Sequence, residues 1–333
     1  MPVSKPFSKT SSISRRSLFK TTAVAGAALA TPQIMTRAAF AEGHAAPTPS
    51  GFNPIQLGDL KATVISDGFA IREEPQSIFG TNVSVEEVEG LLSENYLPTD
   101  KMQFTFAPTV VEAGDNIILF DTGLGEGARG GGLGQTRANL EAAGYAPDAI
   151  THVVLTHMHP DHIGGLSEGG APAYPNAVYV AGETEYGFWS DEARMGTPAE
   201  GIHTQVVDFF GGIEDKLTLI GGDTEIAPGV MAKAAFGHTP GHMIYTLSSG
   251  DKTMAITADT ANHFVLSLQR PDWEVLFDTD KSAAAQVRKD VFGMLAADRI
   301  PFVGYHMPFP SVGFVEAMGE GFRWIPETYQ LDI

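Results

Sequence analysis

The segment His157–His162 constrains this chain more than any other stretch of its sequence. It reads HMHPDH, so three of the chain's ten histidines and one aspartate lie within six positions. The apolar run Val153-Val154-Leu155 ends one residue before the segment and is typical of a buried strand. Open α/β sheets usually carry their chemistry in the loops at strand ends. The segment is therefore expected in such a loop, with its polar side chains at one edge of a sheet.

The spacing within this segment predicts metal binding, with two ions rather than one. His157 and His159 are two positions apart, so both can point the same way from a short extended turn, while Asp161 and His162 can face a second position. The chain has no cysteine, which excludes disulfides and thiolate ligands, so any metal must be held by His, Asp or Glu. A polar loop with satisfied histidines is the other interpretation. Four ligand groups in six residues favour the metal site.

Three further stretches place candidate ligands after apolar runs. FGHTPGH contains His238 and His242, AITADT contains Asp259, and VGYHMPF contains His306. Each alone is ordinary, because a single histidine after a strand is more often structural than catalytic. With His242 set aside, these stretches and the HMHPDH segment supply five histidines and two aspartates. That set is enough for two four- or five-coordinate zinc sites bridged by one carboxylate and one hydroxide.

Strand and helix patterns follow one another in an order that repeats in the two halves of the chain. Strand patterns lie at 61–68, 104–114, 116–123, 151–155 and 176–182, and again at 230–235, 244–247, 254–257 and 300–306. Helical patterns lie at 136–145, 182–195 and 281–297. The order predicts an α/β fold with two sheets packed together and helices outside. No linker separates independent domains, so a single catalytic domain is expected over 59–333.

The first 41 residues differ from the rest of the chain. SRRSLFK (Ser14–Lys20) places paired arginines before an apolar pair, small apolar residues follow at 23–30, and Ala39-Phe40-Ala41 offers an A-x-A cleavage site. We interpret residues 1–41 as a signal peptide of the twin-arginine type, read by the Tat export machinery, and 42–58 as a flexible lead-in. A membrane anchor is the alternative, but spanning a bilayer takes about 20 apolar residues. The mature protein is then expected to be periplasmic or secreted, without a stable membrane anchor.

The charge balance excludes some classes of partner. Removing residues 1–41 takes away six of the 21 basic residues and none of the 40 acidic ones, which leaves a balance of −25. Such a surface repels phosphate backbones, so nucleic acid is not expected as a partner. The charge instead favours a neutral or compact small-molecule substrate.

The order of these motifs resembles that of the metallo-β-lactamase-fold hydrolase superfamily. Asp121 in ILFDTG comes first, and the HMHPDH segment, His238, Asp259 and His306 follow. The resemblance implies an αββα sandwich of two mixed sheets with helices on the outer faces. It also implies two divalent metal ions, with Zn²⁺ as the expected metal.

The resemblance assigns a role to each candidate ligand. Asp259 would bridge both ions, and Asp121 would lie behind the ligands and orient the histidine loop. His242 and His263 are further candidates for such supporting positions. One metal would be held by His157, His159 and His238, and the other by Asp161, His162 and His306.

A narrower resemblance is to the methyl parathion hydrolase branch, which groups with lactonases and arylesterases. It rests on ADTANHF and on GYHMPFPSVGFVEAMGEGFRWIP, with its histidine before a Phe-Pro turn. One departure concerns substrate binding. Many homoserine-lactone lactonases have a tyrosine three residues after the bridging aspartate, where this chain has Asn262. His263 could replace that phenol or be a plain structural histidine.

The expected reaction is hydrolysis of lactones or carboxylic (aryl) esters, and of phosphotriesters as a side activity, by a metal-bridging hydroxide. Asp161 and Asp259 would keep the ions spaced and relay the proton. An aromatic pocket would suit a hydrophobic ester or aryl leaving group. Its candidates are Trp189, with Phe188, Phe264, Phe309 and Asn262, and more weakly Phe209 and Phe210.

Other functions remain open at this stage. Glyoxalase-type thioester hydrolases use the same seven ligands, although they usually need basic residues that this chain lacks. A zinc β-lactamase would lack the bridging aspartate or carry cysteine there. No G-x-S-x-G segment supports a serine hydrolase. A metal-binding protein without activity would be expected to miss a ligand, and none is missing. Oligomers are common in the methyl parathion hydrolase branch that the chain resembles, so a homodimer remains an alternative to a monomer.

Overall fold

The computed structural model describes residues 51–328, which cluster into one compact unit. A first seven-stranded sheet is antiparallel from β1 to β6 and parallel from β6 to β11. Its strands in spatial order are β1 (Phe52–Leu57), β2 (Leu60–Ile65), β5 (Thr109–Ala113), β6 (Asn116–Phe120), β7 (His152–Leu155), β10 (Val178–Gly182) and β11 (Leu217–Ile220).

The second seven-stranded sheet is antiparallel except between β15 and β16, whose parallel pairing requires the long crossover that contains α7. Its strands in spatial order are β12 (Glu225–Ala227), β13 (Val230–Ala234), β14 (Met243–Ser249), β15 (Lys252–Ala258), β16 (Phe302–Gly304), β17 (Val312–Met318) and β18 (Gly321–Pro326). The helices of the structure are α1 (Val85–Glu94), α2 (Thr136–Ala142), α3 (Pro160–Ile163), α4 (Glu183–Ser190), α5 (Glu200–Phe210), α6 (Leu266–Gln269) and α7 (Lys281–Asp298).

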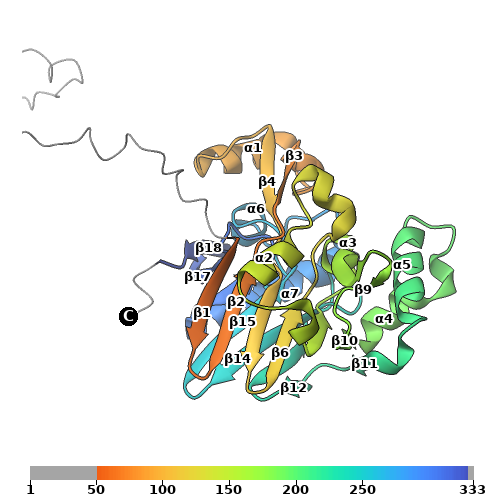
Figure 1. Cartoon of the computed structure of the whole chain (residues 1–333). Helices are drawn as coiled ribbons and strands as arrows, with labels where there is room; N and C mark the ends of the chain where they lie inside the picture. Colours follow the sequence, from red (N-terminus) through yellow and green to blue (C-terminus); the bar gives the residue numbers. More distant parts are fainter. Residues whose placement is uncertain (1–50, 329–333) are drawn as a thin grey trace, which may run out of the picture. The chain divides into compact units, whose positions relative to one another are not determined.

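The two sheets pack face to face, and helices cover their outer faces (Figure 1). Alternation along single strands explains how both faces are filled. In β7, Val154 enters the cluster between the sheets, whereas Val153 and Leu155 pack outward with residues of α2, α4 and α5. In β15, Ile256 points inward and Ala255 packs toward α7. The predicted αββα sandwich with two mixed sheets is confirmed.

A smaller unit lies beside the sandwich and was not predicted from the sequence. The hairpin β3 (Phe69–Glu73) and β4 (Lys101–Thr105) packs with α1 and α6 around Phe79 and Leu92. A further two-stranded sheet pairs β8 (Ser167–Glu168) with β9 (Ala171–Pro172). The hairpin unit matters for function because β4 and the residues after it reach one wall of the site.

Two expectations about strands are corrected. The flexible lead-in is wrong over 52–57, because this stretch pairs with β2 as β1 and buries Ile55 and Leu57 in the core between the sheets. The strand pattern at 104–114 is divided between two strands in different sheets. The strand is interrupted at 106–108, where Pro108 has no N–H to donate to a neighbouring strand. Residues 1–50, with the expected signal peptide and the start of the lead-in, lie outside the described residues. Within 51–328 no helix is long and apolar enough to cross a membrane.

Candidate metal centre

The HMHPDH segment turns directly from β7 into α3. His159 is the N-cap residue of α3, and Pro160 follows at its first position, where the missing proline N–H costs no helical hydrogen bond. Met158 is fully buried in the outer core, so His157 and His159 project to the other side of the short extended turn. The α3 turn then presents Asp161 and His162. The expected strand–loop placement of this segment is confirmed.

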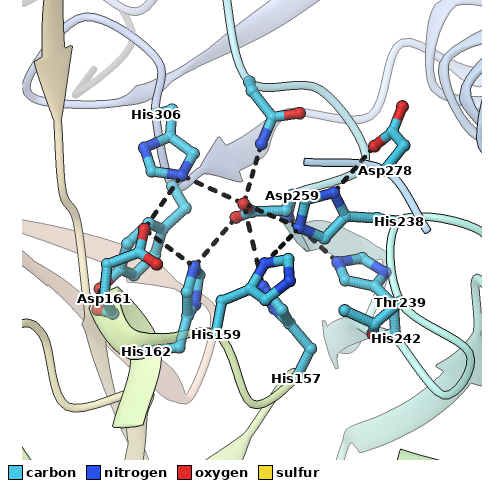
Figure 2. Close-up of polar contacts among 12 residues, drawn as sticks. His157, His159, Asp161, His162, His238, Thr239, His242, Asp259, Asp278 and His306 are labelled. Atoms are coloured by element: carbon cyan, nitrogen blue, oxygen red, sulfur yellow. Dashed lines mark hydrogen bonds and ion pairs between the residues drawn. The ribbon is translucent and has the colours of Figure 1, made fainter. Parts of the chain in front are cut away.

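All seven predicted ligands converge at one edge of the two sheets (Figure 2). Their donor atoms form two groups, and within each group the atoms lie within 4.8 Å of one another. Asp259 belongs to both groups: its Oδ1 lies 3.1 Å from His162 Nε2, and its Oδ2 lies 3.3 Å from His238 Nε2. The groups are His157, His159, His238 and Asp259, and Asp161, His162, His306 and Asp259.

Asp161 and His162 come from α3, and the other donors come from the segments that follow strands. The β13–β14 loop carries His238, Asp259 follows β15, and His306 follows β16. Backbone strain marks two of these ends: Ala258, before Asp259, has a φ of 44°, and Asp121, after β6, has a φ of 60°. Residues other than glycine rarely adopt positive φ, and such strain clusters at functional sites. The strained turns direct both aspartates into the centre.

The histidines are held through the ring nitrogen that faces away from the centre. His162 Nδ1 lies 2.8 Å from Asp121 Oδ2, His238 Nδ1 lies 2.9 Å from Asp278 Oδ1, and His306 Nδ1 lies 2.8 Å from the Thr105 carbonyl oxygen. Partners of this kind fix the orientation of a metal-binding imidazole. The Nε2 atoms of these three histidines point at Asp259 as a result.

Asp121 lies where the sequence placed it, behind the histidine loop. Its Oδ1 accepts a hydrogen bond from Thr156 N and its Oδ2 one from Thr156 Oγ1, each at 2.8 Å. Burial raises the pKa of the Asp121 carboxyl, while His162 and Thr156 act to lower it. One carboxylate thereby ties the end of β6 to the residue before His157 and to His162.

Several buried donor atoms have no hydrogen-bond partner among the described residues. They are His157 Nε2, His162 Nε2 and Asp259 Oδ1. Leaving a buried polar atom unpaired costs about 1–3 kcal/mol, so native proteins rarely do so without a ligand. Imidazole nitrogens and carboxylate oxygens are the donors that divalent transition metals bind. The two groups therefore fit two divalent metal ions that share Asp259.

The charges in the centre complement one another. Burial would raise the pKa of the Asp259 carboxyl, but the His306 and His162 imidazoles hold it well below its usual range. Burial acts to lower the pKa of His238, yet Asp259 and Asp278 raise it to about 9. Burial lowers the pKa of His157 well below its usual range, so this imidazole stays neutral. A cation binds a neutral imidazole and an ionised carboxylate, so metal binding would displace the proton that Asp259 and Asp278 favour on His238.

The remaining supporting candidates differ from one another. His242 Nε2 accepts a hydrogen bond from the Asp259 N–H at 3.1 Å, so this residue does lie behind a ligand. Asn262 Nδ2 donates to Asp259 Oδ2 at 2.8 Å. His263 Nδ1 accepts from the N–H groups of Val265 and Leu266 at the start of α6. The supporting role predicted for His263 is therefore wrong, and it is a structural histidine.

A cavity of about 400 Å³ opens over the metal donors. Its walls are mostly apolar and come from β4, from α5 and from loops, with one cation, Arg72, on β3. The lining consists of Arg72, Phe104, Phe106, Leu124, His159, Pro160, Asp161, Ile202, Asp259, Phe277 and His306.

The pocket predicted from the sequence is corrected. None of its members lines this cavity in the described part of the chain. Trp189 is buried and donates to Glu185, Phe188 packs against Arg194, and Asn262 is buried behind Asp259. Phe264 and Phe309 line a second cavity of about 500 Å³ that meets the first at His306, while Phe209 and Phe210 pack in the outer core.

Two carboxylates near the centre were missed by the sequence analysis. Asp278 binds His238 and also accepts from Arg288 Nη2 at 3.0 Å. Glu185 on α4 accepts hydrogen bonds from the backbone N–H groups of Met158 and Gly241, which lie in two different histidine loops. A signal existed only for Asp278, which lies in the acidic FDTD stretch before a helix. A glutamate within a helical pattern is usually expected to be exposed to solvent. Only the tertiary structure shows that Glu185 is buried.

The sequence profile of the metallo-beta-lactamase superfamily matches residues 108–301, more than half of the chain. The chain belongs to the metallo-beta-lactamase superfamily. The matched region contains every candidate ligand except His306, which follows it by five residues. The resemblance inferred from the sequence is confirmed at this level.

Relatives within the superfamily are lactonases. An N-acyl homoserine lactonase of Bacillus thuringiensis is 30% identical over 122 residues, which are 36% of this chain. An N-acyl homoserine lactonase of Bacillus cereus is 26% identical over a stretch of the same length. In each case the aligned stretch covers 42% of the relative, less than half its length.

Solved structures extend the similarity over most of the chain. AidC, a dizinc quorum-quenching lactonase in complex with N-hexanoyl-L-homoserine, matches 84% of this chain and 98% of its own, with a TM-score of 0.77 and 29% identity. The hydrolase AbOPH of the beta lactamase superfamily matches 85% and 99%, with a TM-score of 0.75 and 26% identity. These similarities agree with the lactonase branch, and the methyl parathion hydrolase part of the expectation stays a prediction.

Proposed function

We propose that this protein is a binuclear zinc hydrolase that cleaves lactones or carboxylic esters. The observation that carries the proposal is the pair of donor groups that share Asp259 at the base of an apolar cavity. The dizinc lactonase among the similar structures supports zinc as the metal and a lactone as the substrate class. When bound, two divalent ions would lower the pKa of a water molecule between them and polarise the substrate carbonyl.

The chain's own residues prepare the site for this reaction. The hydrogen bond from Asn262 Nδ2 engages Asp259 Oδ2 and leaves Oδ1 without a partner, directed toward His162. Asp161 is the donor carboxylate more open to solvent, with 20% of its side chain exposed against 4% for Asp259, and it also lines the cavity. Asp161 is therefore placed to carry a proton from the site to a leaving alkoxide.

The cavity walls favour a substrate with an apolar part. Phe104 and Phe106 pack edge-on against the ring of His306, with centroids 5.1 and 5.4 Å away. Leu124, Ile202 and Phe277 extend the apolar lining. We include aryl esters in the proposal on this ground, with phosphotriesters as a weaker side activity.

The direct test is metal removal followed by a substrate screen. Protein treated with a chelator should lose hydrolysis of an N-acyl homoserine lactone, of dihydrocoumarin and of an aryl acetate, and zinc should restore it. A metal count near two per chain is expected after reloading. Full activity of metal-free protein, or a metal count near zero, would contradict the proposal.

The same screen separates the alternatives. Nitrocefin tests the β-lactamase alternative, a glutathione thioester tests the glyoxalase type, and a paraoxon-like triester tests phosphotriester cleavage. We expect lactones or aryl esters to give the highest kcat/KM. A thioester or nitrocefin that exceeded both would replace the proposed substrate class.

We also propose that the protein is exported to the periplasm or secreted. The support is the paired-arginine pattern at Ser14–Lys20 and the A-x-A stretch at 39–41. Fractionation of cells that express the full chain should place the mature protein outside the cytoplasm. Replacing both Arg15 and Arg16 by lysine should retain it inside, and unchanged export would contradict the twin-arginine assignment.

A further inference from the structure

Glu185 is a buried carboxylate on α4 that contacts both loops of the first donor group. Its side chain is enclosed, with 1% of the residue exposed. Oε1 accepts hydrogen bonds from Met158 N at 2.9 Å and from Trp189 Nε1 at 2.7 Å. Oε2 accepts from Thr239 Oγ1 at 2.7 Å and from Gly241 N at 2.9 Å. All four partners are uncharged donors; three of them tie α4 to the two histidine loops, and the fourth, Trp189, lies on α4 itself.

The two loops that Glu185 joins carry the three histidines of one donor group. Met158 lies between His157 and His159, and Thr239 follows His238. The approach of α4 to the second loop is close: a Cβ on Gly241 would come within 2.2 Å of the Glu185 backbone nitrogen. A displacement of this carboxylate would therefore move the histidine loops relative to each other.

The other donor group is held by different residues. Asp121 binds His162, the Thr105 carbonyl oxygen binds His306, and Tyr305 Oη donates to the backbone oxygen of Asp161 at 2.6 Å. None of these contacts involves α4. The two groups thus have largely different supports, although they share Asp259 and the HMHPDH segment, and Asp121 also contacts Thr156 beside His157.

We propose that Glu185 is a positioning residue that sets the metal affinity of the His157–His159–His238 site more strongly than that of the other site, because only the first site takes ligands from both loops that Glu185 joins. The inference rests on the proposed binuclear function. Its physical basis is that one carboxylate fixes the spacing between two loops that supply three ligands to one ion. Loss of such outer contacts typically weakens metal binding by about 10–100-fold.

The test measures zinc affinity one site at a time, by competition with a fluorescent chelator. His306→Ala leaves the first site as the measurable one, and His238→Ala leaves the second. In the His306→Ala background, Glu185→Gln should weaken zinc binding by at least about tenfold. In the His238→Ala background the same change should weaken the affinity much less, because the second site takes no ligand from the His238 loop. Equal weakening in both backgrounds, or no weakening in the first, would overturn the inference.

Matched variants separate positioning from general stability. Asp67 is also fully buried and accepts from Leu124 N, Gly134 N and Thr136, but it is tied to loops without donors. Asp67→Asn should lower the thermal midpoint and keep both zinc affinities. An equal loss of zinc affinity in Asp67→Asn would reduce Glu185 to a structural role and overturn the inference.

Milder changes keep the inference testable if Glu185→Gln fails to fold. Thr239→Val removes one bond between α4 and the His238 loop and should weaken the first site, whereas Thr239→Ser keeps the hydroxyl and should restore it. Ser190→Ala removes a hydroxyl of α4 that donates to the Tyr186 carbonyl oxygen, and this variant should bind zinc as before. Indistinguishable Val and Ser variants would overturn the inference. If the wild-type protein bound no zinc, the proposed function would fail together with this inference. Two zinc equivalents per wild-type chain would exclude that outcome, so that a negative result in the variants would concern Glu185 alone.

Discussion

The metal centre and the cavity above it are built in different ways. The centre gathers seven side chains from α3 and from the segments that follow strands of both sheets. His162, His238 and His306 are fixed by hydrogen bonds, and Asp259 follows a strained turn. The cavity wall comes from the β3–β4 hairpin, from α5 and from single loop residues, and it consists mostly of apolar contacts. The two sheets thus carry the residues for the reaction, and the elements attached to them carry the residues that determine which substrate fits.

This difference separates two kinds of constraint on the sequence. A donor must be His, Asp or Glu at one point in space, so few substitutions are tolerated. A wall residue has only to be apolar and of suitable size, so its identity carries little information. Changes in the centre should therefore abolish activity for every substrate, whereas changes in the wall should shift preference among substrates.

The largest effect is expected for Asp259→Ala. This change removes the carboxylate common to both donor groups and leaves His162 Nε2 and His306 Nε2 without their partner. kcat/KM should fall by at least about 10³-fold for lactones and esters alike. For comparison, the loss of a single group that stabilises an oxyanion costs up to about 10³-fold in kcat. Metal content, measured by atomic emission, should fall below two per chain.

A matched control for this variant lies on the same hairpin. Asp251 is exposed in the β14–β15 turn, at the other end of the strand that leads to Asp259. Asp251→Ala should keep both the metal and the activity. If Asp259→Ala kept two metals and half of its activity, the shared carboxylate would not be the centre of the site.

The same contrast explains how far the sequence alone could lead. The seven donors were predictable because His-x-His-x-Asp-His is rare by chance and because residues after strands meet at one sheet edge. Short continuous apolar runs located most central strands, such as β7 and β15. β3 escaped because its large apolar residues Phe69 and Ile71 are exposed and only the small Ala70 is buried. β4 does alternate, with Met102 and Phe104 buried, but the predicted strand began only at Phe104.

The wall residues could not be predicted for a related reason. Trp189 and Ile202 both come from helices near the centre. Trp189 was favoured by its aromatic ring, by its place at the end of an apolar helical segment and by a tryptophan at a similar place in the methyl parathion hydrolase branch. Which of them faces the cavity depends on the rotation of α4 and α5 against the sheet, and local sequence does not fix that rotation. Glu185 was missed likewise, because its burial follows from how α4 packs between two distant loops.

A smaller and substrate-dependent effect is expected for Ile202→Ala. Ile202 lines the cavity from α5 and contacts no donor hydrogen bond, so its loss should reduce apolar contact with a bound acyl chain. For a long-chain lactone KM should rise roughly tenfold, in the range that hydrophobic pocket contacts contribute, with kcat little changed. For a short-chain lactone both constants should stay the same.

Val207 offers the control on the same helix. Its side chain is 40% exposed and lies outside the cavity lining, so Val207→Ala should alter neither substrate. The contrast between centre and wall would fail if Ile202→Ala lowered kcat equally for long and short chains, because α5 would then act on the reaction itself.

The smallest effect is expected for Phe188→Leu, which tests the corrected pocket assignment. The Phe188 ring lies against Trp189, with centroids 4.9 Å apart, and the Arg194 guanidinium sits 4.3 Å from its centre. Loss of this cation–π contact should lower the free energy of unfolding by about 0.5–1 kcal/mol, measured in urea. KM for long and short lactones and the metal content should remain at wild-type values, since the ring lies outside the cavity lining. If KM instead rose as much as in Ile202→Ala, α4 would contact the substrate. The cavity wall would then include the helix that carries Glu185.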